Sequence, residues 1–186
     1  MNNNMGKWDG WYAGLRKSSP QTYGDDTTYR GGAAHLAGLA VEDWGCGKGG
    51  LRPFMPPGLY RGIDGSRTPF ADEIVDLTTY RSSTPGLFLR HVLEHNYDWA
   101  TILDNAVASF TERMVLVLFT PLAESTREFA FSDPPGVPDI SFAEWDLTSR
   151  FDGAEWEKRE LATGTQYGVE TVFLLVRPVT AAPISR

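Results

Sequence analysis

The chain has 186 residues, a length that suits one compact domain with its own hydrophobic core. Its formal net charge of −7 disfavours a nucleic-acid partner, because an acidic surface repels phosphate groups. The single cysteine, Cys46, excludes an internal disulfide framework and fits a reducing compartment. There is no secretory signal and no apolar run of about 18 residues, so we expect a cytoplasmic protein with no membrane segment.

The N-terminal part of the chain is rich in aromatic residues and glycines. Residues 6–17 place three aromatic side chains and a leucine at helical spacing, which predicts an amphipathic helix. Residues 18–32 contain Pro, Gly, Asp and Thr and predict a loop. Residues 33–40 predict a short helix that leads into the first strand.

The rest of the chain alternates between apolar strand-like segments and short connections. The predicted strands cover residues 40–44, 59–64, 72–77, 86–92, 114–120, 155–161 and 169–176. Helices are predicted at 99–110 and at 141–151, the second from Ser141 and Glu144 in a capping-box pattern. The last two strands predict an antiparallel hairpin, so we expect a single α/β domain with a mostly parallel seven-stranded sheet. Ligands of such sheets bind at the carboxyl ends of the strands.

Residues 41–50, Val-Glu-Asp-Trp-Gly-Cys-Gly-Lys-Gly-Gly, form a glycine-rich turn at the end of the first strand. A phosphate-binding P-loop is excluded, because Gly49 follows Lys48 where Ser or Thr is needed and Glu42 replaces the first glycine.

A dinucleotide-binding turn fits this segment better but not well. The glycines satisfy GxGxxG, and Asp64 lies at the spacing of a ribose-binding carboxylate. However, Pro56 and Pro57 leave room for only a short helix after the turn. Glu42 and Asp43 would also repel a pyrophosphate, whereas they suit a cofactor that carries positive charge.

S-adenosylmethionine is such a cofactor, since it has a sulfonium and an ammonium group and no phosphate. Asp43 followed by Gly45, Gly47 and Gly49 resembles the glycine-rich first motif of the class I (Rossmann-like) S-adenosylmethionine-dependent methyltransferases. The resemblance continues in register from about residue 40 to residue 178 and includes the C-terminal hairpin.

The resemblance implies a role for each of its motifs. Asp64 would bind the ribose hydroxyls, Asp76 the adenine amino group, and Leu77 would pack on the adenine ring. The run 88–95, Phe-Leu-Arg-His-Val-Leu-Glu-His, would line the methionine arm of the cofactor. The cofactor-binding residues expected on this basis are Asp43, Gly45, Cys46, Gly47, Gly49, Asp64, Gly65, Ser66, Asp76, Leu77 and His91.

The resemblance also implies a division of the chain. Residues 1–39 follow no family rule and are expected to form a helical and looped lid over the substrate. Residues 40–178 would form the methyltransferase core, and residues 179–186 a flexible tail. The run 133–136, Asp-Pro-Pro-Gly, is expected to be a loop, because it lacks the stacking aromatic residue of DNA amino-methyltransferases.

The expected activity is methyl transfer from S-adenosylmethionine to an O, N or C atom of a small molecule or sugar. His91 or His95 is the candidate general base; a helix after the fourth predicted strand would place them four residues apart on one face. No metal site is expected, because the histidine spacing does not match HExxH. Candidate walls of the acceptor pocket are Tyr12, Tyr23, Tyr29, Phe119 and Trp145. Two alternatives remain open: a catalytically silent binding protein with this fold, and a nicotinamide-dependent oxidoreductase.

Overall fold

The computed structural model describes residues 5–178, so the predicted tail lies outside the described residues. The helices are α1 (Asp9–Tyr12), α2 (Thr27–His35), η1 (Arg52–Phe54), η2 (Leu93–His95), α3 (Trp99–Ser109) and α4 (Glu144–Thr148). The strands are β1 (Val41–Trp44), β2 (Tyr60–Asp64), β3 (Glu73–Ile74), β4 (Thr84–Arg90), β5 (Phe110–Leu118), β6 (Arg127–Ser132), β7 (Val137–Ser141), β8 (Glu155–Ala162) and β9 (Val169–Val176).

Seven of these strands form one sheet in the order β3-β2-β1-β4-β5-β9-β8. The five strands from β3 to β5 are parallel, whereas β9 pairs antiparallel with both β5 and β8. The predicted seven-stranded sheet and its closing hairpin are therefore confirmed. The strand order reverses between β1 and β4, which is where ligands of parallel sheets bind.

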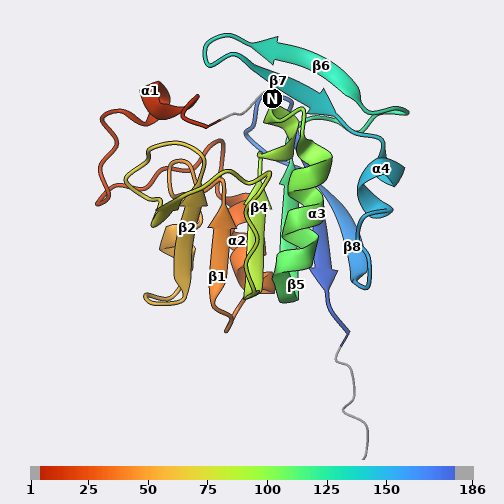
Figure 1. Cartoon of the computed structure of the whole chain (residues 1–186), viewed down its shortest axis with the longest axis horizontal. Helices are drawn as coiled ribbons and strands as arrows, with labels where there is room; N and C mark the ends of the chain where they lie inside the picture. Colours follow the sequence, from red (N-terminus) through yellow and green to blue (C-terminus); the bar gives the residue numbers. More distant parts are fainter. Residues whose placement is uncertain (1–4, 179–186) are drawn as a thin grey trace, which may run out of the picture.

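The alternation of side chains along the central strands builds a hydrophobic core on each face of the sheet. In β4, Leu87 and Leu89 join the core beneath α3, while Phe88 between them joins the core beneath α2. In Figure 1, α3 lies in front of the sheet and α2 behind it. Strand β4 is buried along nearly its whole length, as its apolar sequence predicts.

A two-stranded hairpin, β6–β7, lies above the end of the sheet at which the parallel strands end, close to α1 (Figure 1). The sequence analysis missed this hairpin, because Pro138 within β7 weakens the strand signal. Its turn is the run 133–136, so the loop prediction for that run is confirmed. The hairpin covers the carboxyl ends of the parallel strands.

The predicted helices at the N-terminus were wrong in extent. α1 covers only Asp9–Tyr12, because Gly6 and Gly14 on either side have left-handed backbone angles of 72° and 92°. α2 begins at Thr27, within the predicted loop, and ends at His35. Gly31 and Gly32 lower the helix propensity of this segment, so the sequence did not predict a helix there. Gly32 is needed at its position because α2 approaches Phe88 closely.

The first crossover holds only the 3-10 turn η1, in agreement with the short helix that Pro56 and Pro57 predict. Two further predictions of local structure need correction. The third strand is only two residues long. Ser141 does not cap a helix: it is the last residue of β7, and Ala143 occupies the N-cap position of α4. Within residues 5–178, no helix is both long enough and apolar enough to cross a membrane.

Candidate functional site

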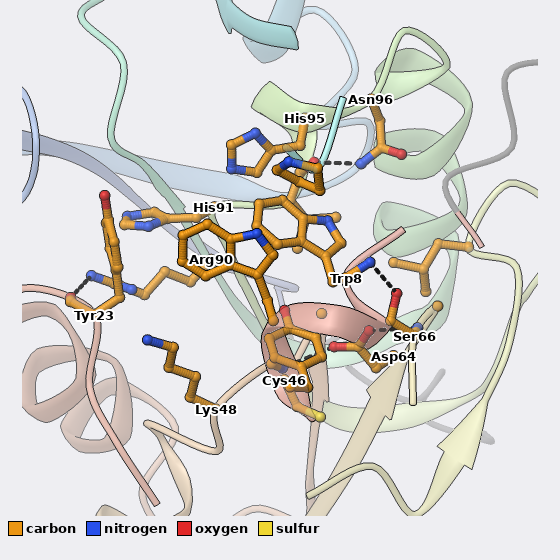
Figure 2. Close-up of a pocket in the computed structure, with 18 of the residues that line it drawn as sticks. Trp8, Tyr23, Cys46, Lys48, Asp64, Ser66, Arg90, His91, His95 and Asn96 are labelled. Carbon is orange, nitrogen blue, oxygen red and sulfur yellow. Dashed lines mark hydrogen bonds between the residues drawn. The ribbon is translucent and has the colours of Figure 1, made fainter. Parts of the chain in front are cut away.

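A cavity of about 530 Å³ opens at the carboxyl ends of the parallel strands. The glycine turn after β1, the end of β2, the segment after β4, the N-terminal segment and the β6–β7 turn all contribute to its walls. Figure 2 shows Asp64 and Ser66 toward one end of this cavity and Tyr23 and His91 toward the other. The site is therefore built where the sheet topology predicts it.

The glycine turn can take its path only because two of its residues lack a side chain. Gly45 and Gly47 have left-handed backbone angles of 74° and 48°. A Cβ atom on Gly45 would lie 2.2 Å from Val92, and one on Gly47 would lie 3.0 Å from the hydroxyl of Tyr12. The turn thus presents the bare backbone of Gly45 and Gly47 to the cavity.

Asp64, the last residue of β2, anchors this turn and lines the cavity. Its Oδ2 accepts a hydrogen bond from the Gly47 N–H (2.8 Å) and its Oδ1 one from the Ser66 N–H (2.8 Å). Burial raises the pKa of Asp64 to about 6, although these backbone donors oppose the shift. Gly65 and Ser66 also line the cavity, and the Ser66 hydroxyl accepts from the Trp8 N–H.

Asp76 and Leu77 lie just beyond the end of β3, beside an apolar part of the wall. Asp76 Oδ1 accepts from the backbone N–H of Thr78 (2.9 Å) and from its hydroxyl (2.6 Å). Leu77 is buried, and Val75 and Ile102 line the cavity beside it. This part of the wall therefore combines apolar side chains with one carboxylate, that of Asp76.

Asp43 and Gly49, two of the expected cofactor-binding residues, do not line the cavity. The Asp43 carboxylate is buried behind the turn and accepts from the Tyr60 hydroxyl (2.9 Å), and burial raises its pKa to about 7. Gly49 packs against Phe70. Cys46 does line the cavity, but burial raises the pKa of its thiol, so a nucleophilic thiolate is disfavoured.

His91 and His95 do not lie on one helix, because the chain after β4 turns sharply. His91 has a left-handed φ of 56°, and His95 ends the 3-10 turn η2. Both nevertheless line the same cavity, and their rings contact Phe119 at centroid distances of 4.7 and 5.3 Å.

The two histidines differ in charge because their surroundings differ. Burial, followed by the charge of Arg90, holds the pKa of His91 well below its ordinary value. Burial also lowers the pKa of His95, but the hydrogen bond to Asp139 and the charge of Glu94 raise it more, so that pKa lies above its ordinary value. At neutral pH the cavity therefore holds one neutral and one more readily protonated imidazole.

Four of the five aromatic residues expected to form pocket walls do so: Tyr12, Tyr23, Tyr29 and Phe119. Tyr29 also belongs to the core beneath α2, where its hydroxyl accepts from Arg90 (2.7 Å). Trp145 does not contribute to the cavity and is 75% exposed on α4.

The sequence analysis did not assign several lining residues. Trp8 and Lys48 stood within segments already singled out, but no pattern showed that their side chains face the cavity. Gln166 and the β6–β7 turn reach the cavity from loops distant in sequence, which only the tertiary structure brings together. The unassigned lining residues are Met5, Trp8, Trp11, Lys48, Val75, Thr78, Asn96, Ile102, Ser132, Asp133, Pro134, Pro135 and Gln166, whereas Arg90 and Val92 belong to the run 88–95 that was expected to line the cofactor. Among residues 5–178, no group of three His, Cys, Asp or Glu side chains is placed to hold a metal ion.

Comparisons with known proteins address the fold. No protein-family model matches the sequence, and no curated protein matches it. Among solved structures, magnesium protoporphyrin IX methyltransferase from Synechocystis PCC 6803 with bound S-adenosylhomocysteine is similar, with a TM-score of 0.59 and 17% identity over 82% of this chain and 83% of that one. A second is 1,6-didemethyltoxoflavin-N1-methyltransferase from Burkholderia thailandensis, with a TM-score of 0.63 and 15% identity over 82% and 79% of the two chains.

A third similar structure extends over nearly the whole of both chains. It is the protein found in complex with the Haloferax volcanii Trm112 methyltransferase activator, with a TM-score of 0.62 and 13% identity over 95% of this chain and 98% of that one. Sheet order, closing hairpin and these similarities agree. The chain has the fold of the class I S-adenosylmethionine-dependent methyltransferases.

Proposed function

We propose that this protein transfers a methyl group from S-adenosylmethionine to a nucleophilic atom of a small molecule. The observation that carries the proposal is the union of the bare glycine turn and Asp64 in one cavity at the topological switch point of the sheet. Solved structures with this fold also contain bound S-adenosylhomocysteine or S-adenosylmethionine.

In this proposal the cofactor lies along the wall formed by the first three strands. Asp64 accepts from the ribose hydroxyls, Asp76 accepts from the adenine amino group, and Leu77 packs on the ring. The backbone of residues 45–47 faces the methionine arm, and His91 lies toward the reacting methyl group.

The chemistry is a displacement at the sulfonium methyl, which the cofactor itself activates. The chain supplies alignment of acceptor and methyl group, which contributes up to about 7–11 kcal/mol in favourable cases. The segment before α2 forms the lid: Trp8 and Tyr12 line the cavity, and the Lys7 ammonium donates to the Gly136 carbonyl of the β6–β7 turn (2.7 Å). The lid is therefore shorter than the expected 1–39, because α2 packs against the sheet.

A small acceptor is favoured by the limited volume of the cavity, about 530 Å³ for cofactor and acceptor together. The acidic net charge of −7 argues against a nucleic acid. We place the activity in the cytoplasm, since the only cysteine is a free buried thiol.

Isothermal titration of the purified protein with S-adenosylhomocysteine, with NAD as the control, tests this proposal. We expect micromolar binding of S-adenosylhomocysteine, about −8 kcal/mol, and no binding of NAD. Binding of NAD alone would instead support an oxidoreductase. Binding of S-adenosylhomocysteine without turnover on any acceptor would support a catalytically silent protein.

A further inference from the structure

His91 holds a left-handed backbone conformation that residues other than glycine rarely adopt. Among residues 5–178 it is the one non-glycine residue with a positive φ, 56°. Such a conformation persists only where surrounding contacts impose it, and it clusters at functional sites. Its position, directly after β4 and on the cavity wall, makes the contacts of its ring informative.

The ring of His91 contacts a buried carboxylate on β9, two strands away from β4 in the same sheet. Its Nε2 hydrogen-bonds Oε1 of Glu170, which lies in β9 and is 1% exposed. Two more groups hold the same carboxylate: Arg90 Nη2 lies 2.7 Å from Oε1, and the Thr28 hydroxyl donates to Oε2 (3.1 Å). Contacts from α2 and β4 thus hold the Glu170 carboxylate in place independently of His91.

This arrangement defines which nitrogen of His91 carries the proton. Burial raises the pKa of Glu170, but the charge of Arg90 and the hydrogen bond from Thr28 oppose the shift and favour the ionised carboxylate. An ionised carboxylate only accepts hydrogen bonds, so Nε2 of His91 is the donor. The Arg90 guanidinium balances the charge of Glu170, and burial lowers the pKa of His91, so the imidazole is neutral. Its second nitrogen, Nδ1, then carries a lone pair, and no group within residues 5–178 hydrogen-bonds it.

His95 differs from His91 at this point. Its Nδ1 donates to the carbonyl of Pro138 (3.0 Å) and lies 3.3 Å from Asp139 Oδ1. These contacts favour the protonated ring, and a protonated ring cannot accept a proton. Of the two candidate bases, the geometry therefore favours His91.

The walls near His91 are aromatic. Phe119 lies 4.7 Å from the His91 ring, and Tyr23 meets it edge-on at 5.7 Å. Trp8 and Tyr12, stacked on each other at 6.4 Å, line the same cavity. Such walls favour a flat aromatic molecule, because offset and edge contacts between rings add to the gain from burial.

We propose that Glu170 is a positioning residue that orients His91 as the general base for an aromatic hydroxyl acceptor; this inference rests on the proposed function. A general base is needed only where the acceptor must lose a proton when it takes the methyl group, as a hydroxyl does. An acceptor that is itself a carboxylate is already ionised and needs no base. A phenol is the more acidic kind of hydroxyl, with a pKa of about 10 for tyrosine, so among hydroxyl acceptors it gives up its proton to a neutral imidazole most readily as the bond to the methyl carbon forms.

The acceptor oxygen forms a bond to the methyl carbon while the carbon–sulfur bond breaks, and its electron pair stays on sulfur. The acceptor proton passes to Nδ1 of His91. The products are the methyl ether, neutral S-adenosylhomocysteine and an imidazolium whose charge the Glu170 carboxylate stabilises until the proton leaves to water.

The tautomer of His91 can be measured without knowing the acceptor. The chain has three histidines, so long-range ¹H–¹⁵N spectra of the whole protein can be assigned with single variants. We expect neutral His91 with a proton on Nε2 and none on Nδ1 at pH 7. A proton on Nδ1, or a charged ring at pH 7, would overturn the proposal, and this measurement needs no variant of Glu170.

Activity then tests the role of Glu170, with catechol and 1-naphthol as phenolic probes and release of S-adenosylhomocysteine as the readout. Glu170→Gln should lower kcat at least about tenfold, with little change in KM or in affinity for S-adenosylhomocysteine. The substitution should also move the acid limb of the pH profile of kcat to lower pH. Without the Glu170 carboxylate the protonated form of His91 is less stable, so the pKa of its imidazole falls. The matched control is Glu160→Gln, which removes an exposed carboxylate on β8. It should leave kcat and its pH profile unchanged.

Three outcomes separate the possible failures. Equal rates and an unmoved pH profile in Glu170→Gln would remove Glu170 from the mechanism. Methylation of aniline or glucose but not of the phenols would overturn the acceptor class while the proposed function stands. Failure of the wild-type protein to bind S-adenosylhomocysteine would overturn the proposed function itself.

Discussion

Asp64 performs two tasks with one side chain. Its carboxylate accepts the Gly47 N–H, which holds the glycine turn, and it lines the cavity where the proposed ribose lies. Burial would be unfavourable for an isolated carboxylate, but two backbone donors at 2.8 Å compensate for the lost water. The same residue therefore joins the local structure of the turn to the proposed affinity for the cofactor.

Replacing Asp64 by Ala should weaken binding of S-adenosylhomocysteine by roughly 1.5–3 kcal/mol, the range for hydrogen bonds to a charged group. Titration calorimetry at pH 8 measures the change. Asp104→Ala is the control, since Asp104 pairs with Arg150 on the exposed surface of α3. A folded Asp64→Ala protein with unchanged affinity would contradict the ribose assignment.

The pKa of Asp64, raised to about 6 by burial, adds a pH dependence to the same interaction. The ionised carboxylate is the better acceptor for ribose hydroxyls, so affinity for S-adenosylhomocysteine should rise as pH increases through 6. Calorimetric titrations between pH 5 and 8, at intervals of about half a unit, check this. A flat profile would show that Asp64 does not change its protonation on binding.

At the scale of the element, α2 shows how packing overrides helix propensity. Gly31 and Gly32 are adjacent in the helix, but Gly31 is exposed and Gly32 is buried against Phe88. A Cβ atom on Gly32 would lie 2.4 Å from Cε2 of Phe88, whose side chain is fully buried and cannot move aside. The glycine thus sets the distance between α2 and the sheet.

These neighbours form a matched pair of variants. Gly32→Ala should lower the free energy of unfolding by about 1–3 kcal/mol, the usual cost of overpacking, despite its better helix propensity. Gly31→Ala meets no atom within 4 Å and should raise that free energy by up to about 1 kcal/mol. Urea denaturation of both variants measures the difference, and equal effects would show that α2 does not pack as described.

At the scale of the whole molecule, buried carboxyl groups couple the stability of the fold to pH. Glu94 is completely buried; its Oε1 accepts the Phe119 N–H (2.7 Å), and its Oε2 has no hydrogen-bond partner within residues 5–178. Burial raises the pKa of Glu94 to about 7. The folded state therefore binds the proton more tightly than the unfolded state, in which the pKa is near 4.5.

The sign of the effect follows from this difference. Between about pH 4.5 and 7 the unfolded chain releases the proton and the folded chain keeps it, so Glu94 reduces stability as pH rises and adds no further change above 7. The full cost is on the order of 3 kcal/mol, at about 1.4 kcal/mol for each pKa unit. Glu94→Gln mimics the protonated form and removes this dependence.

We therefore expect the stability of Glu94→Gln relative to wild type to increase from pH 5 to pH 7.5. Urea denaturation at four pH values measures it. Glu128→Gln, an exposed carboxylate on β6, is the control for the loss of one charge. A constant difference between Glu94→Gln and wild type across this range would mean that Glu94 is ionised in the fold.

The sequence alone predicted the sheet and the main motifs because each depends on local pattern. Apolar runs define β4 and β5, alternation defines the closing hairpin, and glycine spacing defines the turn after β1. Asp64 and Asp76 were predicted to lie at the site because the sequence places each of them at the end of a predicted strand. These features need no knowledge of which distant residues they meet.

Only the tertiary structure decided what depends on contacts between distant segments. It moved Asp43 behind the turn, placed Trp145 in solvent and brought the β6–β7 hairpin over the cavity. It also joined His91 to Glu170, which lies 79 residues further along the chain. Burial and charge around a side chain determine its protonation, and both are set by residues that the fold, rather than the local sequence, makes neighbours.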